Sequence, residues 1–186
     1  MADHNLVSLL TETILPEMRR MSYGSAQYLA YGQIAVGIEL FGACADADPF
    51  DTERVSRRRF ELGITRYMAP VDARYPRYIG CKNPYDLYTH LRCGMAHLLR
   101  PQGKVGFTSR GDTLKDGTQH LEVYAPRNLL VLVIEDFFDH FQVATKAFIA
   151  DLPNLDQTKV AGVFLPVHDP APAPVEIAAP EPSGVP

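Results

Sequence analysis

The chain has 186 residues, 46% of them hydrophobic, which fits one globular domain with a single core. A net charge of −4 and a pI near 5.8 argue against a general nucleic-acid coat protein, although they leave room for a local basic cleft. The three cysteines form no CxxC pair, so they indicate neither a disulfide framework nor a zinc site, and they favour a reducing compartment.

The sequence also predicts that the protein is neither secreted nor inserted in a membrane. Its N-terminal segment has no basic region ahead of the apolar residues, unlike a secretory signal. The longest apolar run, Leu129 to Ile134, is far too short to span a bilayer. We therefore expect a cytoplasmic protein with no membrane partner.

Two helices are predicted at the start of the chain. Helical spacing of apolar residues predicts the first from Asn5 to Met21, with a kink or break near Leu15 because Pro16 interrupts it. The second is expected over residues 25–44, and its predicted buried stripe is Ile34, Ile38 and Phe41. Glycines spaced five apart in this helix indicate close approach of another helix: Gly32, Gly37 and Gly42.

A third, strongly basic helix is expected from Asp51, which fits an N-cap, to about Tyr67. Its run of three arginines, residues 57–59, could face a phosphate, but solvated arginines on an outer face are commoner. The Pro- and Tyr-rich segment 69–82 follows as a loop or crossover. Its alternating cations and aromatics could clamp a nucleobase and its phosphate, with Arg74 and Lys82 among the substrate contacts. The favoured interpretation is that its tyrosines cover the end of the core.

The segment from Asn83 to Arg100 predicts the helix around which the chain is organised, because Asn83 can cap it and Pro84 suits its first turn. At about 100° per residue, one face is apolar and consists of Leu87, Tyr88, Leu91, Met95, Leu98 and Leu99. The opposite face carries cations among small side chains: Thr89, His90, Arg92, Cys93, Ala96, His97 and Arg100. Gly94 costs about 1 kcal/mol relative to Ala in mid-helix, which indicates close approach of a ligand, a partner helix or a helix of the same chain.

After this helix, two short strands at residues 104–108 and 119–124 are predicted to form a hairpin around turn-forming GDTLKDG. The last helix is expected from Pro126 to about Leu152, with a strong apolar stripe. Acids on its flanks could pair with the arginine-rich helix or with Arg92: Glu135, Asp136 and Asp139. Residues 153–186 are expected to form an extended, disordered tail rich in Pro and Ala.

The expected fold class is all-α: an antiparallel four- to five-helix bundle over residues 1–152, with a small β-hairpin inserted between the last two long helices. No Gly-rich phosphate loop, GxSxG or HExxH motif occurs. Cys93 and His97 could be taken for a nucleophile pair, but a mid-helix cysteine lacks the helix N-terminus that lowers a thiol pKa. His90 and His97 lack a third ligand, so we expect no metal and no cofactor.

The stretch LYTHLRCGMAHLLRP resembles the signature helix of HEPN-like helical-bundle proteins, in which four to six residues separate an Arg from a His. Arg92 and His97, with four residues between them, match this hallmark. The surrounding residues are similar to the LRxGhxH core of prokaryotic members, where h is apolar: Leu91, Gly94 and Met95. The similarity in layout runs over about residues 25–151.

This resemblance implies a homodimer whose Arg and His side chains line a cleft at the two-fold interface, and in many members a metal-independent endoribonuclease of toxin or defence type. His97 would act as general base or acid, and Arg92 would hold the phosphate. His90 and Arg100 would be secondary phosphate contacts. RNA or a nucleotide, and an antitoxin-like protein, are the implied partners.

One departure from the family pattern argues for the alternative function. Active members commonly carry Asn, Asp or another polar residue directly after the Arg, where this chain has Cys93. Loss of nuclease activity would leave a non-catalytic helical module that binds a nucleotide or a protein, with Arg92 and His97 paired structurally to acids such as Glu135 or Asp136.

Overall fold

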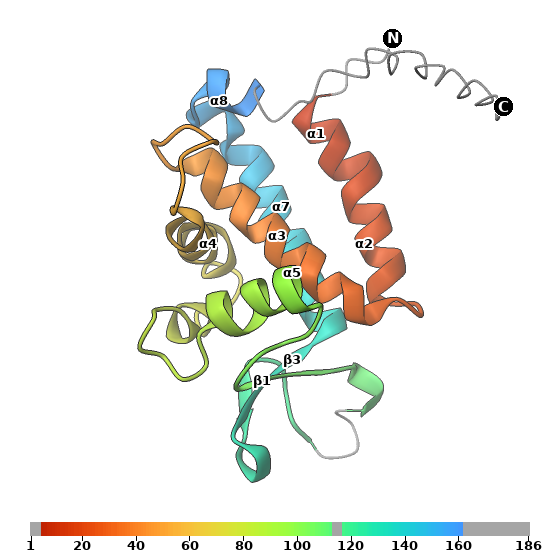
Figure 1. Cartoon of the computed structure of the whole chain (residues 1–186). Coiled ribbons are helices and arrows are strands. Elements are labelled where there is room, and N and C mark those ends of the chain that lie inside the picture. The colour runs from red at the N-terminus through yellow and green to blue at the C-terminus, as the bar shows by residue number, and fades with distance from the viewer. Residues whose placement is uncertain (1–4, 113–116, 162–186) are drawn as a thin grey trace, which may run out of the picture.

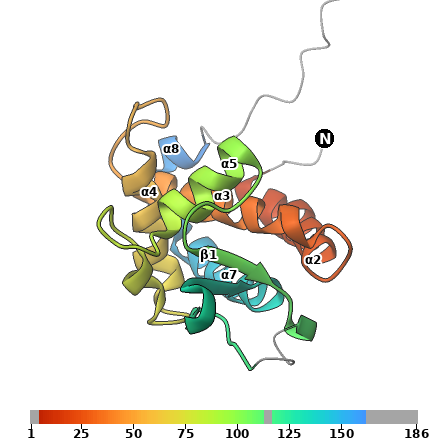
Figure 2. The same ribbon diagram turned by 60° about the horizontal axis from the view of Figure 1, so that its bottom comes forward.

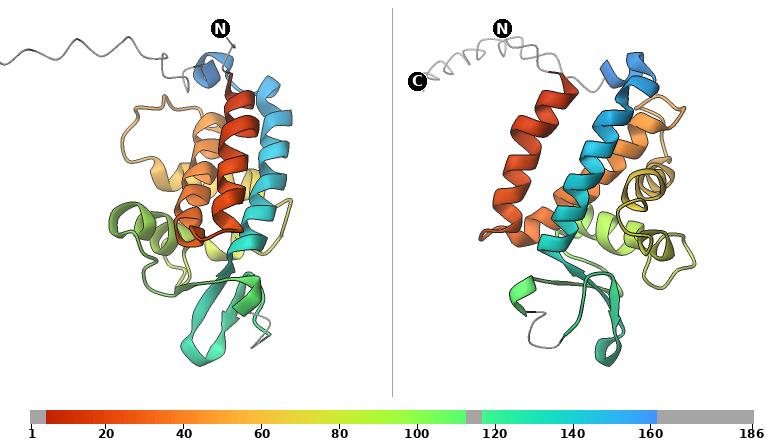
Figure 3. Two further views of the ribbon diagram at one scale, coloured as in Figure 1. Left: turned by 90° about the vertical axis from the view of Figure 1, so that its right-hand side faces the viewer. Right: turned by 180° about the vertical axis from the view of Figure 1, so that it is seen from behind.

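The computed structural model describes residues 5–112 and 117–161, which form a helical bundle with a small sheet at one end (Figure 1). One long helix runs through α1 (Leu6–Ser8), a π-helical segment (Leu9–Ile14) and α2 (Leu15–Ser22). It packs beside α3 (Gln27–Ala45) and α7 (Ile134–Asp151), as the views in Figure 3 show. The shorter helices are α4 (Ser56–Gly63), α5 (Gly94–Leu98) and α8 (Gln157–Ala161). The expectation of a mostly helical fold is confirmed, although the fold also contains a three-stranded sheet.

The first helix begins at a capping box and continues past Pro16 without a break. Asn5 Oδ1 accepts a hydrogen bond from the Ser8 amide at 2.9 Å, and Ser8 Oγ accepts one from the Asn5 amide at 3.2 Å. The wider π turns come directly before Pro16, where a proline removes one backbone donor. The predicted break near Leu15 is therefore a change of helical pitch.

The central helix α3 buries the predicted stripe completely, since Ile34, Ile38 and Phe41 are all inaccessible to solvent. It crosses α4 at two glycines: a Cβ on Gly42 would lie well under 3.0 Å from the Arg59 carbonyl oxygen, and one on Gly63 would meet that of Ile38. The predicted close approach of another helix is thus confirmed. Within the described residues, α3 alone is long and apolar enough to cross a membrane, but half of it is buried among the neighbouring helices, as in a core helix.

The sheet differs from the predicted hairpin. Its strands are β1 (Val105–Thr108), β2 (Glu122–Tyr124) and β3 (Leu129–Val133), in the order β1-β3-β2. β1 runs parallel to β3 with Val105 opposite Leu130, and β2 runs antiparallel to β3 with Val123 opposite Leu130. The hairpin prediction was wrong because β3 lies between the two strands that were expected to pair.

The third strand comes from sequence that was assigned to the last helix. The run LLVLV is buried over four of its five residues, and a continuous apolar run suits a central strand as well as a helix core. A 3₁₀ turn at Ala125–Arg127 and Asn128 in the left-handed region (φ 51°) precede it. The last helix therefore begins at Ile134, where β3 ends, and Figure 2 shows α7 behind the sheet.

The chain also stays folded beyond the predicted domain boundary. A 3₁₀ turn (Leu152–Asn154) leads into α8, and Lys159 Nζ donates to the Asp46 carbonyl at 3.0 Å and to its carboxylate. Leu155 and Val160 pack against the core. The prediction of an extended tail was therefore wrong for residues 153–161, and residues 162–186 lie outside the described part.

Candidate functional site

The helix that carries Arg92 and His97 is shorter than predicted. It consists of a π-helical segment (Tyr88–Cys93) followed by α5. Asp86 caps its start, because its Oδ2 accepts from the Thr89 amide at 3.2 Å and from Thr89 Oγ1 at 2.6 Å. Asn83, the predicted cap, instead accepts from the Tyr85 amide in the preceding turn. The helix ends at Leu98, and the next residue has left-handed backbone geometry.

The π turns alter which side chains face the core. Leu87, Leu91 and Met95 are buried as predicted, but Leu98 is 51% exposed and Leu99 67% exposed. A π turn holds more residues than an α turn, so the later residues rotate away from the face expected at 100° each. The prediction that Leu98 and Leu99 belong to the apolar core face was wrong.

Gly94 marks a close backbone approach, as predicted, but the neighbour is the chain's own return after the helix. A Cβ there would lie 2.5 Å from the Arg100 carbonyl oxygen and 3.0 Å from the Gln102 amide nitrogen. Leu99 turns the chain at a φ of 52°, and the Arg100 amide then donates to the Gly94 carbonyl at 3.3 Å. This space is therefore filled within the protomer.

Arg92 is anchored along one edge of its guanidinium. Its Nε donates to the carboxylate of Glu39 on α3, whose other oxygen accepts from Ser56 Oγ at 2.6 Å. The Tyr88 ring lies beneath it, with its centroid 5.9 Å from Arg92 Cζ and 4.5 Å from Arg57 Cζ. The side chain is 20% exposed. Across residues 5–112 and 117–161, the Nη atoms of Arg92 have no hydrogen-bond partner.

The other predicted members of this face have different surroundings. His97 is exposed and makes no hydrogen bond within the described part of the chain, and Arg100 is exposed as well. His90 is half-buried against Gly103, where a Cβ would overlap its ring, and its buried Nδ1 has no partner among the described residues. The face therefore presents Arg92 and His97 to solvent, while His90 packs inward.

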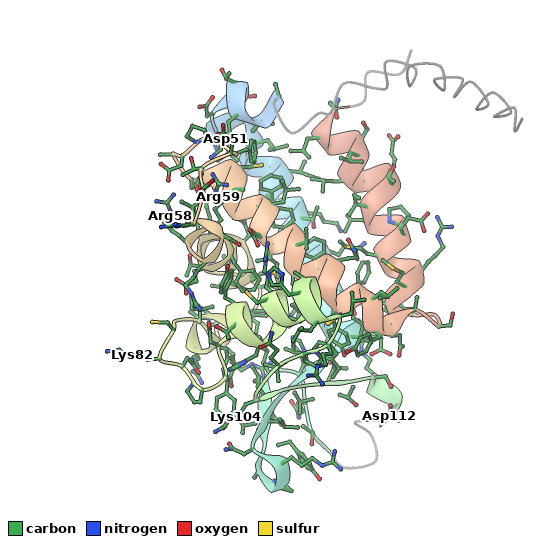
Figure 4. All side chains as sticks on the ribbon, in the orientation of Figure 1. Asp51, Arg58, Arg59, Lys82, Lys104 and Asp112 are labelled. Carbon is green, nitrogen blue, oxygen red and sulfur yellow. The ribbon has the colours of Figure 1, made fainter. Side chains whose placement is uncertain are left out.

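The two predicted contacts from the preceding loop lie apart from this face. Arg74 pairs with Asp72, with Nε 3.0 Å from Oδ1 and Nη2 2.6 Å from Oδ2, and lines a pocket with His120 and His140. Lys82 is exposed and projects outward from its loop (Figure 4). No hydrogen bond or ion pair of the described residues links either cation to Arg92.

The three arginines of α4 all pair with acids of the same chain, and only Arg58, whose side chain is 57% exposed, lies on a solvated outer face as the favoured interpretation expected. Arg57 donates to Asp86 and Thr89, each at 2.8 Å. Arg59 is buried and donates to Asp46 at 2.8 Å and to loop carbonyls, while Arg58 pairs with Asp46 at 3.2 Å; Figure 4 shows both at the start of α4, near Asp51. These arginines hold the loop between α3 and α4.

The acids of α7 also find partners other than those predicted. Glu135 accepts from the Arg110 amide at 3.0 Å, and Asp136 accepts from the Arg110 guanidinium at 2.6 and 2.8 Å. Asp139 accepts a hydrogen bond from the same guanidinium at 2.6 Å. The predicted pairing of these acids with the arginine-rich helix or with Arg92 was wrong, because Arg110 lies nearer.

Sequence reasoning missed a second polar cluster around Tyr75, a residue of the 3₁₀ turn Tyr75–Tyr78. Tyr75 is fully buried, and its hydroxyl lies 3.1 Å from His120 Nε2 and 3.1 Å from His140 Nδ1. His120 is 4% exposed, and its Nδ1 accepts from the Val133 amide at 3.1 Å. These residues come from three distant segments, so no spacing in the sequence signals them. The burial of Tyr75 does agree with the interpretation that the loop tyrosines cover the core.

Comparison of the sequence with protein-family models and curated proteins, and of the structure with solved structures, gives no match. The resemblance to HEPN-like proteins therefore stays a prediction from the Arg92–His97 motif.

Proposed function

We propose that the protein is a HEPN-like, metal-independent endoribonuclease that acts as a homodimer through Arg92 and His97. The observation that carries the proposal is that both side chains extend from one short helix, with the Arg92 Nη atoms and the His97 ring unpartnered among the described residues. The chemistry of each group suits cleavage of RNA through its own 2′-hydroxyl.

Arg92 is suited to bind the scissile phosphate. Glu39 accepts from Nε alone, which orients the guanidinium and leaves its Nη edge for two phosphate oxygens. This contact favours the transition state, because negative charge grows on the non-bridging oxygens as the 2′-oxygen attacks. Lysine cannot reproduce such a two-point contact.

His97 is suited to transfer the protons of the reaction. Imidazole titrates near neutrality, so it can accept the proton of the 2′-hydroxyl or donate one to the leaving 5′-oxygen. The 2′-oxygen forms a bond to phosphorus while the bond to the 5′-oxygen breaks. The products are a 2′,3′-cyclic phosphate and a free 5′-hydroxyl.

A second copy of the chain supplies the other wall of the cleft in this proposal. Leu98 and Leu99 are exposed at the C-terminal end of the motif helix, and α5 packs on α3 at Gly32, where a Cβ would lie 3.3 Å from Met95 Cβ. Leu29 and Val36, on the same side of α3, are half-exposed. Exposed apolar side chains on both sides of this contact favour an interface. We also propose RNA as the substrate, an antitoxin-like protein as a partner and the cytoplasm as the location.

The test is cleavage of a single-stranded RNA in EDTA by the wild type and by His97→Ala. We expect the wild type to leave cyclic phosphate ends and His97→Ala to lose cleavage by about 100-fold or more. Arg20→Ala, which removes an exposed arginine of α2, is the matched control and should cleave normally. Cleavage that persists in His97→Ala overturns the proposal.

The alternative is a non-catalytic helical module that binds a nucleotide or a protein, and the Arg92–Glu39 ion pair favours it. In that case Arg92 joins the motif helix to α3, and Cys93 supplies no polar group beside it. The alternative predicts no RNA cleavage and a loss of stability or dimerisation in Arg92→Ala. A wild type that cleaves RNA in EDTA rules it out.

A further inference from the structure

A pocket of about 250 Å³ lies at the junction of the 3₁₀ turn, the sheet and α7, away from the motif helix. The residues that line it include Arg74, Gln119, His120, Val133, Asp136 and His140. Five of these side chains are polar groups that the proposed ribonuclease reaction does not use. The volume suits a molecule of amino-acid size.

The hydrogen bonds at the back of the pocket determine the protonation of both histidines. Because His120 Nδ1 accepts from the Val133 amide, the single ring proton of His120 is on Nε2, which faces the Tyr75 hydroxyl. The Tyr75 hydroxyl oxygen accepts a hydrogen bond from the His120 Nε2–H, so the Tyr75 O–H donates to His140 Nδ1. His140 is therefore a neutral imidazole with its proton on Nε2.

This arrangement gives His140 a definite role toward a ligand. Its Nε2–H is a hydrogen-bond donor, as in sites where a neutral imidazole polarises an oxygen. Acting as a base would require His140 to move its proton to Nδ1, which would leave the buried Tyr75 O–H without an acceptor. His140 is thus suited to bind an acceptor atom and unsuited to remove a proton.

The charges around the pocket select the kind of ligand. Two arginines and three aspartates act on the imidazoles of His120 and His140, and together they carry one net negative charge. They are Arg74, Arg110, Asp72, Asp136 and Asp139. A ligand with only a negative charge would be repelled by this net negative charge. A zwitterion can instead place its carboxylate near an arginine and its ammonium group near an aspartate. Arg74 binds Asp72 through Nε and Nη2, so its Nη1 is the nitrogen that, with the His140 Nε2–H, suits a carboxylate. Asp136, one helical turn before His140, accepts from Arg110 through Oδ1, so its Oδ2 suits an ammonium group.

We propose that this pocket binds a small zwitterion of the amino-acid type, with its carboxylate at Arg74 and His140 and its ammonium group at Asp136. The site is independent of the proposed ribonuclease centre, since no residue is common to both. Tyr75 and His120 are positioning residues, which hold His140 as a donor.

The test uses the full chain labelled with ¹⁵N-histidine and long-range ¹H–¹⁵N spectra, which report the tautomer of each ring. We expect His140 to be protonated on Nε2 before any addition, and at least one standard amino acid to shift its signals saturably at millimolar concentration. Acetate and methylammonium, each with only one of the two charges, should bind at least about tenfold more weakly.

Matched variants separate this site from general charge effects. Arg74→Gln and Asp136→Asn should each weaken binding about tenfold or more, whereas Arg77→Gln on the same turn and Asp51→Asn, at an exposed aspartate before α4, should leave it unchanged. The proposal is overturned if no standard amino acid shifts the His140 signals, if acetate alone does so equally well, or if His140 is protonated on Nδ1. None of these results depends on RNA cleavage.

Discussion

At the scale of single residues, Arg92 shows how a motif side chain can be both anchored and available. Its Nε is bound to Glu39, while its terminal nitrogens have no partner among the described residues. Glu39 lies 53 positions earlier, so no local pattern could predict the pair. The motif spacing placed Arg92 and His97 on one helix, where the Arg92 side chain is 20% exposed and His97 is exposed.

The hydroxyl of Tyr75 contributes to stability because it lies between two histidines. Tyr75→Phe leaves a buried nitrogen on each of two histidines without its partner, so we expect a loss of about 1–3 kcal/mol in the free energy of unfolding. Urea denaturation measures it. Tyr28→Phe, at an exposed tyrosine, is the control and should change stability little. Equal effects of the two substitutions would refute the hydrogen-bonded chain.

His120 makes stability depend on pH. Burial, and then the neighbouring His140, lowers its pKa from 6.5 to about 3. Between these values the unfolded chain binds a proton that the folded chain does not, so stability falls as the pH falls below 6.5. The contribution is about 1.4 kcal/mol per pH unit.

This dependence can be measured by urea denaturation at several pH values between 7 and about 5. His120→Asn keeps an acceptor for the Val133 amide but removes the titrating ring, so its stability should fall less steeply on acidification. The wild-type and variant curves share every other titrating group. Parallel curves would contradict a buried, neutral His120.

At the scale of elements, the prediction succeeded where side-chain size and periodicity decide the structure. The buried stripe of α3 and the glycines at its crossings could be predicted, because only a very small residue admits another backbone so closely. The strand β3 could not be predicted, because the apolar run LLVLV is equally typical of a buried helix and a buried strand. The π turns before α5 and the end of the helix at Leu98 were also missed, and Leu98 and Leu99 are exposed there instead of in the predicted apolar face.

The crossing of α3 and α4 should tolerate no larger residue at Gly42. Gly42→Ala places a methyl group against the rigid Arg59 carbonyl, so we expect a loss of about 3 kcal/mol or more in the free energy of unfolding. Thermal and urea denaturation measure it. Gly106→Ala in β1 is the control, since its nearest atom would be a Leu129 methyl at an ordinary 3.5 Å. A stable Gly42→Ala protein would show that the helices do not pack this closely.

At the scale of the whole molecule, the proposed dimer explains an otherwise unfavourable residue. Leu99 is 67% exposed and has a positive φ, a backbone geometry that Asn adopts more readily. An apolar side chain there gains nothing in an isolated protomer. A second copy that covers it would account for both features.

We therefore expect Leu99→Asn to make the protein monomeric while its folded state stays at least as stable. Light scattering after size-exclusion chromatography measures the mass, and thermal denaturation checks the fold. Val143→Asn, at an apolar residue of α7 that is also exposed, should remain dimeric. A monomeric wild type would show that there is no dimer interface. A dimer that persists in both variants would show that the interface lies elsewhere.

The most direct test of the account is cleavage of one single-stranded RNA in EDTA by wild type, His97→Ala and Leu99→Asn side by side. A composite site at a two-fold interface predicts cyclic phosphate products from the wild type alone, because one variant lacks the proton-transfer group and the other lacks the second wall of the cleft. Undiminished cleavage by His97→Ala, or no cleavage by a dimeric wild type, would contradict it.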